Sequence, residues 1–148
     1  MADSQHFLSR NKVTMYDHDP ADSTVATDVA WVDMRDFTNF VAIAFASALT
    51  GTGVIAFKIL GNSQADGSGT DVVIKTHALG SAPDAVGDYV MLECTAEEIA
   101  AASTTASGKL RYVSANLDCN NAADENVVVY IRSGARFPTK DLSADTVA

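Results

Sequence analysis

The sequence is poor in the residues that usually perform chemistry or cross-link a fold: among 148 residues it has two cysteines, three histidines and one tryptophan. Two cysteines are too few for a disulfide framework, and they are not spaced as zinc ligands are. Both thiols lie within strand-like runs. We therefore expect Cys94 and Cys119 to be buried and to behave as small apolar side chains.

Positive charge is scarce as well: ten Lys and Arg residues stand against 19 Asp and Glu residues, a formal net charge of −9. Such a surface repels phosphate groups, which argues against nucleic acid or an anionic membrane as a direct partner. No apolar run reaches the roughly 18 residues of a membrane-spanning helix, and the N-terminus lacks the apolar stretch of a signal peptide. We expect a soluble protein made inside the cell, with a protein or a neutral glycan as its partner.

The chain is patterned as short strands separated by turns rich in Gly, Asn and Asp, with no alternation of strands and helices. This pattern predicts an all-β fold, an antiparallel β-sandwich or jelly roll of about seven strands. Thr95 and Glu98 form a capping-box pair that predicts one short connector helix. The expected strands are 29–34, 40–49, 54–60, 71–79, 89–95, 110–119 and 127–133. In residues 89–95 we expect Val90, Leu92 and Cys94 to face inward.

Two expectations concern the middle of the chain. In residues 40–49 we expect Val41, Ile43 and Phe45 to face the core and the alternating alanines to lie on the other face. Alanines there suggest a closely covering partner, although a solvated sheet face can also carry them. The following TGTG turn leads into residues 54–60, and this arrangement predicts a hairpin between the two strands.

The length suits one domain with its own core. Residues 1–24 are polar and lack a regular period, so we expect an extended N-terminal arm. The sandwich then occupies residues 25–138, and residues 139–148 form a short C-terminal tail.

No segment of the sequence strongly predicts a catalytic or metal-binding site. The segment Tyr16–Pro20 holds a histidine and two aspartates, but neighbouring residues in one segment rarely converge on a metal ion. Of the histidines, His6 and His18 lie in the expected arm, and His77 is expected on the outward face of a strand. The TGTG turn lacks the lysine of a phosphate-binding loop. We therefore expect a non-enzymatic protein with no catalytic, metal or cofactor residues.

Several segments together resemble small virion proteins of tailed bacteriophages. In that family a V-D-M segment leads into an apolar strand, a hairpin with a K-L-x-x-S-x-D-x-S-G pattern follows, and an R-Y-V strand precedes a last strand that ends in G-A-R-x-x-P. The matching positions are Val32, Asp33 and Met34; 58–69; Arg111, Tyr112 and Val113; and Gly134, Ala135, Arg136 and Pro138.

The resemblance implies a β-sandwich that decorates the outer surface of a capsid, a cement protein bound to the major capsid protein. It also implies self-association, as a homotrimer, and location on the virion after a stage in the host cytoplasm. It supplies no catalytic or cofactor residues.

An extended arm and broad sheet faces suit contact with a repeated protein lattice. The residues expected to make protein contacts are His6, Phe7, Leu8, Tyr16, Phe40, Ala42 and Ala44. Two alternatives remain open: a tail, neck or baseplate component of the same virion, and a carbohydrate-binding sandwich for host attachment. A sugar site usually presents exposed aromatic rings, and the single tryptophan, Trp31, is expected in a buried strand.

Overall fold

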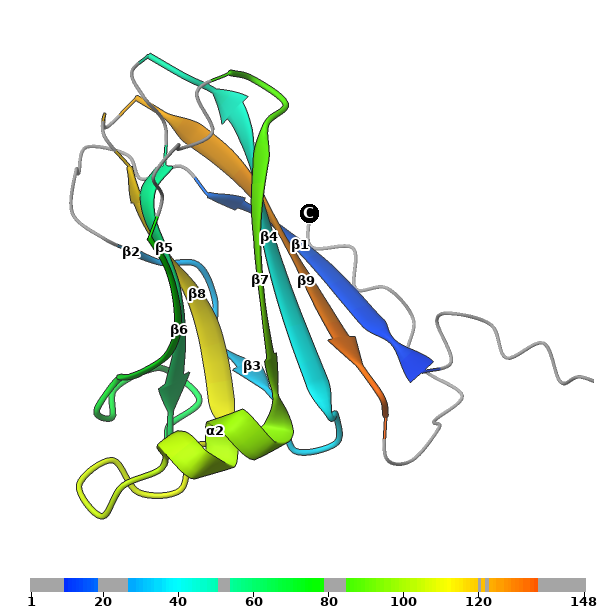
Figure 1. Ribbon diagram of the computed structural model, residues 1–148, viewed down its shortest axis with the longest axis vertical. Helices are drawn as coiled ribbons and strands as arrows, with labels where there is room; N and C mark the ends of the chain where they lie inside the picture. The colour runs from blue at the N-terminus through cyan, green and yellow to red at the C-terminus, as the bar shows by residue number, and fades with distance from the viewer. Residues whose placement is uncertain are drawn as a thin grey trace, which may run out of the picture.

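A computed structural model of the chain describes residues 10–18, 27–50, 54–78, 85–119, 121 and 123–135. It shows two antiparallel sheets packed face to face, with one short helix across one end (Figure 1). The all-β sandwich expected from the sequence is confirmed. No helix in the described part of the chain is long and apolar enough to span a membrane.

Sheet A has four strands in the order β1, β9, β4 and β7, and sheet B is built around the order β2, β8, β5 and β6, with β3 also paired to β8. The bounds in sheet A are β1 Lys12–His18, β9 Glu125–Ser133, β4 Asn39–Ala48 and β7 Tyr89–Thr95. The bounds in sheet B are β2 Thr27–Asp28, β3 Val32–Asp33, β5 Val54–Asn62, β6 Val72–Ala78 and β8 Tyr112–Cys119. The helix α2, Ala96–Ala102, follows β7 directly and starts at the expected capping box of Thr95 and Glu98.

The core lies between the sheets and is formed by one face of each. Phe40 and Tyr130 pack edge to face in sheet A, with their ring centroids 4.9 Å apart. Phe57, Ile59 and Leu117 of sheet B are also buried in this core. The inward positions expected in β7 are confirmed, since Val90, Leu92 and Cys94 all belong to the core or pack against it.

The expected orientation of residues 40–49 is wrong. Ala42 and Ala44 are fully buried, whereas Val41 and Ile43 are partly exposed on the opposite face. The reason lies in the neighbouring strand, because Ala42 pairs directly with Tyr130, and the large ring leaves room only for a small side chain beside it. The alanines are thus the core face of β4.

The hairpin expected across the TGTG turn is also wrong. β4 lies in sheet A and β5 in sheet B, so the connection passes from one sheet to the other. The partners of β5 are β8 and β6. A glycine-rich turn between two alternating strands fits both a hairpin and a crossing between sheets, and the local pattern does not distinguish them.

The boundary expected for the N-terminal arm is wrong in one part. All seven residues of β1, Lys12–His18, pair with β9, so this part of the expected arm is an edge strand of the sandwich. Residues 1–9 and 19–26 lie outside the described residues, as does the expected tail, 139–148.

The strand expected at 29–34 is wrong in its bounds: within it only Val32–Asp33 is strand (β3), while β2 lies before it at Thr27–Asp28, and the Tyr130 hydroxyl reaches β8 between the two. The backbone N–H of Ala115 in β8 donates a hydrogen bond to the Tyr130 hydroxyl oxygen at 2.7 Å. Burial raises the pKa of Tyr130 to about 12. The Tyr130 hydroxyl thus accepts the hydrogen bond that a neighbouring strand would otherwise accept from Ala115, so this buried N–H group has a partner.

Candidate protein-contact surface

The outward face of sheet A is unusually apolar for a sheet face over which the described residues place no further layer. Antiparallel sheets with one exposed face usually alternate apolar inward residues with polar outward ones. In the middle of sheet A both sets are mainly apolar, and polar side chains such as Asn39, Thr95 and Ser133 lie toward the end of the outward face. Sheet B follows the usual rule, since its outward positions include Lys58, Thr76, Asn116 and Asp118.

The strand register places twelve outward side chains of sheet A in three rows that run across all four strands. Ten of the twelve are apolar or aromatic, and we call this set the apolar sheet face. Its rows are Asp17, Val127, Phe45 and Tyr89; Met15, Val129, Ile43 and Met91; and Val13, Ile131, Val41 and Glu93.

The two edge strands present the most exposed side chains of this face. Met15 on β1 is 59% exposed, and Tyr89 and Met91 on β7 are 63% and 52% exposed. The ring of Tyr89 leans against Phe45, with 5.7 Å between the centroids. From standard strand spacings the three rows cover about 380 Å². This footprint includes the two acidic positions, and it lies within the size range of the largest apolar patch of an ordinary monomer, which is often functional.

Charge on this face has one sign. Asp17 and Glu93 occupy diagonally opposite corners, and Glu125 lies one step beyond the first row. The cationic residues of the four strands, Lys12 and Arg132, are at inward positions. The outward positions of sheet A therefore combine an apolar centre with an acidic edge.

The structure corrects three of the expected contact residues. Phe40, Ala42 and Ala44 are 0% exposed and form part of the core, so a partner cannot reach them in the folded chain. Tyr16 is half-buried and packs edge to face on Tyr130, 5.0 Å between centroids, on the inward side of β1. The other three, His6, Phe7 and Leu8, lie outside the described residues.

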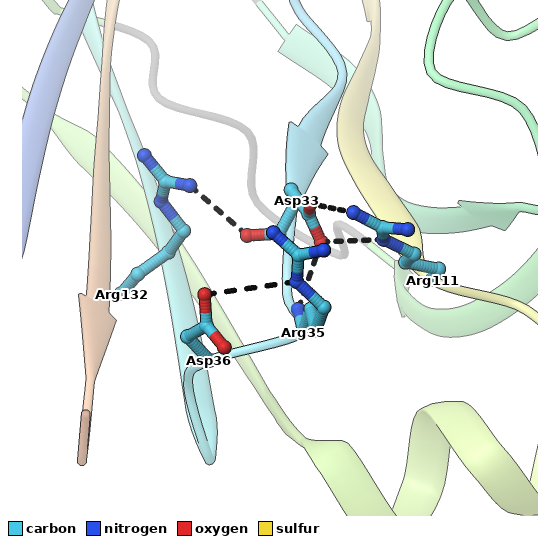
Figure 2. Close-up of polar contacts among 5 residues, drawn as sticks. All are labelled: Asp33, Arg35, Asp36, Arg111 and Arg132. Atoms are coloured by element: carbon cyan, nitrogen blue, oxygen red, sulfur yellow. Dashed lines mark hydrogen bonds and ion pairs between the residues drawn. The ribbon is translucent and has the colours of Figure 1, made fainter. Parts of the chain in front are cut away.

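Two of the residues that carry the family resemblance meet in a polar cluster at the end of the sandwich near α2 (Figure 2). The carboxylate of Asp33 accepts hydrogen bonds from Arg111 Nε at 3.0 Å and Nη2 at 2.5 Å. The Asp33 carbonyl accepts another from Arg132 Nη1 at 3.0 Å. Hydrogen bonding from Arg111 lowers the pKa of Asp33. This cluster ties β3 to both sheets, which is a structural role.

A recess of about 520 Å³ adjoins this cluster beside α2. Its floor includes the buried side chains of Met34, Ile99 and Leu110, and Arg35 and Lys109 stand in its lining. Arg111 and Tyr112 also line the recess, and the Arg111 guanidinium is paired with Asp33.

The thiols are buried as the sequence predicted. Cys94 and Cys119 are both free and buried, and burial raises their pKa values to about 12 and about 11. His18 lies within hydrogen-bonding distance of the Thr27 hydroxyl, 3.0 Å. The outward orientation expected for His77 is wrong. His77 lies opposite Phe57 in the register of β5 and β6, so both side chains are on the inward face of sheet B. Among the described residues, no three His, Cys, Asp or Glu side chains are grouped to hold a metal ion.

Protein-family models give no match to the sequence, and neither do curated proteins. Among solved structures, a chain from Bacillus endospore appendages, described as a novel family of disulfide-linked pili, is 10% identical, with a TM-score of 0.35 over 83% of this chain and 86% of its own. Chains of infectious bursal disease virus, strains Gt and Gx, are 12% and 10% identical, with TM-scores of 0.39 and 0.42 over 87% of this chain. The alignments cover 35% and 34% of those viral chains. At these scores the likenesses carry no argument about function.

Proposed function

We propose that this chain is a non-enzymatic structural protein of a tailed-phage virion, which decorates the capsid by binding the major capsid protein through the apolar sheet face. The observation that carries the proposal is the apolar outward face of sheet A. The resemblance to tailed-phage virion proteins supplies the kind of partner. Cofactors have no place in the proposed role.

The physical case rests on what the face gains when it is covered. Met15 and Met91 are more than half exposed, and covering each would contribute about 1 kcal/mol of binding free energy. The strands that carry them are hydrogen-bonded into a sheet, so little backbone freedom is lost on docking.

The proposal is tested by measuring how a variant binds empty capsids built from the major capsid protein of the phage that encodes the chain. The double variant Met15→Gln and Met91→Gln removes about 2 kcal/mol of apolar burial, so we expect roughly 30-fold weaker binding. The matched control is Val73→Gln, because Val73 on sheet B has the same 52% exposure as Met91. Equal binding by the double variant and the control would refute docking through this face.

Copy number distinguishes capsid decoration from a role in the tail, neck or baseplate. A decoration protein occupies a site repeated over the whole shell, whereas a neck or tail protein occupies a few symmetric positions. Quantitative mass spectrometry of purified particles should therefore find this chain in numbers comparable to those of the major capsid protein. A copy number close to that of the tail proteins would favour a role in the tail, neck or baseplate over capsid decoration.

A further inference from the structure

We infer that the apolar sheet face is built for a different protein surface, one with an apolar centre and two basic side chains near opposite corners, and not for a second copy of this chain. The inference rests on the proposed docking role and specifies the chemistry of the partner. It follows from the position of charge in the three rows of the face.

Asp17 and Glu93 mark the two acidic corners. They are separated by three strand spacings across the sheet and by two rows along the strands, which places their Cα atoms about 20 Å apart. Both are exposed, and neither forms an ion pair with another described residue. The nearby Lys75 is bound instead to Glu98, with 2.5 Å between Nζ and Oε1. Lys75 acts on Glu93 through its charge without pairing with it, so Asp17 and Glu93 each keep a carboxylate that has no ion-pair partner among the described residues.

A second copy fits this face poorly. If two copies packed face to face about a two-fold axis, each corner of one face would lie opposite a position of the same face in its copy. None of the twelve positions is a cation. Asp17 would then meet either another carboxylate or an apolar side chain, and burial of an unpaired carboxylate is costly. The net charge of −9 adds repulsion between copies.

A basic partner removes this obstacle. Lysine or arginine side chains placed about 20 Å apart could pair with the two corners while an apolar ridge covers Ile43 and Val129 in the middle row. Charges at the rim of an interface mainly steer association and exclude like-charged surfaces. The acidic corners therefore select for the partner, and the apolar centre provides most of the contact. The homotrimer implied by the family resemblance would have to use another surface.

The test combines charge reversal, salt and the oligomeric state of the free protein. The probe is again the empty capsid. We expect the double variant Asp17→Lys and Glu93→Lys to bind at least about tenfold more weakly than the wild type at low salt, and to lose most of its salt dependence. The matched control is Asp36→Lys and Glu97→Lys, which reverses two exposed charges away from the face and should bind within about threefold of the wild type.

The outcomes separate this inference from the proposed function. If the wild type binds capsids and charge reversal at the corners changes nothing, the inference is overturned and the docking role stands. If the wild type does not bind capsids, the docking role fails, and the inference fails with it. Sedimentation of the free protein gives an independent result: Met15→Gln with Met91→Gln should leave the oligomeric state unchanged. Dissociation of an oligomer by these changes would show that the face binds a second copy, against the inference.

Discussion

Asp33 and Arg111 lie 78 residues apart in the sequence and form a bidentate ion pair that joins β3 to the residue directly before β8. Both positions belong to the segments that carry the family resemblance. The backbone N–H of Arg35 also donates to the same carboxylate, at 2.8 Å. These contacts give a structural reason for the V-D-M segment and the R-Y-V strand to occur in the same protein. The aspartate of the first segment pairs with the arginine of the second.

This pair predicts a pH-dependent contribution to stability. The hydrogen bonds from Arg111 lower the pKa of Asp33 in the folded state, so ionised Asp33 stabilises the fold above its ordinary pKa. The contribution is lost as the pH falls through the lowered pKa. We expect Asp33→Asn to reduce the free energy of unfolding by about 1 kcal/mol at pH 7, since the pair is partly exposed, and by less as the pH drops below about 4.

Urea denaturation of wild type and Asp33→Asn at several pH values measures this difference. Asp36→Asn serves as the control, because Asp36 is exposed and lies 3.7 Å from Arg35 in a surface pair. A difference between wild type and Asp33→Asn that stays constant down to pH 2 would contradict the assignment.

At the scale of single elements, β4 determines how the sandwich is oriented. Its alanines face the core, and its branched and aromatic residues face outward. We expect Ala44→Leu to destabilise the fold by about 1–3 kcal/mol, because the side chain would be forced into a filled core. Ile43→Thr on the outward face should cost less than about 1 kcal/mol.

Thermal or urea unfolding of these two variants measures the orientation directly. If Ile43→Thr were the more destabilising change, the original expectation that Ile43 faces the core would be restored and the apolar sheet face would not exist.

The sequence was sufficient to predict most strands, the helix with its capping box, the buried thiols and the inward residues of β7. It failed where the answer depends on a partner strand. Alternation in β4 is equally regular on both faces, and only the pairing of Ala42 with Tyr130 shows which face is inside. Likewise, the TGTG turn does not reveal that β5 pairs with β8 from much later in the chain. The polar character of β1 concealed an edge strand.

The contact surface was missed for a related reason. Its rows draw residues from β1, β4, β7 and β9, so it becomes visible only when the register of the whole sheet is known. One signal was present in the sequence: Val127, Val129 and Ile131 alternate with Val128 and Tyr130, so β9 is apolar on both faces. A strand of that kind in a sandwich calls for a covering partner on each side.

At the scale of the whole molecule, the two sheets differ in their outward chemistry. Sheet B presents mainly polar side chains to its surroundings, with Val73 as an exposed apolar exception, and sheet A presents ten apolar or aromatic ones with acids at two corners. The high negative charge keeps such a molecule from associating nonspecifically through its apolar side. This asymmetry is what is expected of a protein with one side toward a partner and the other toward solvent.

Methionine oxidation tests the central claim most directly, because Met15 and Met91 are both exposed on the apolar sheet face while Met34 is only 4% exposed in the core. A peroxide pulse converts accessible methionines to sulfoxides, which mass spectrometry quantifies at each position. Capsid-bound protein should show at least about tenfold slower oxidation at Met15 and Met91 than free protein, with Met34 slow in both. Equal oxidation of Met15 and Met91 in the bound and free protein would contradict docking through this face.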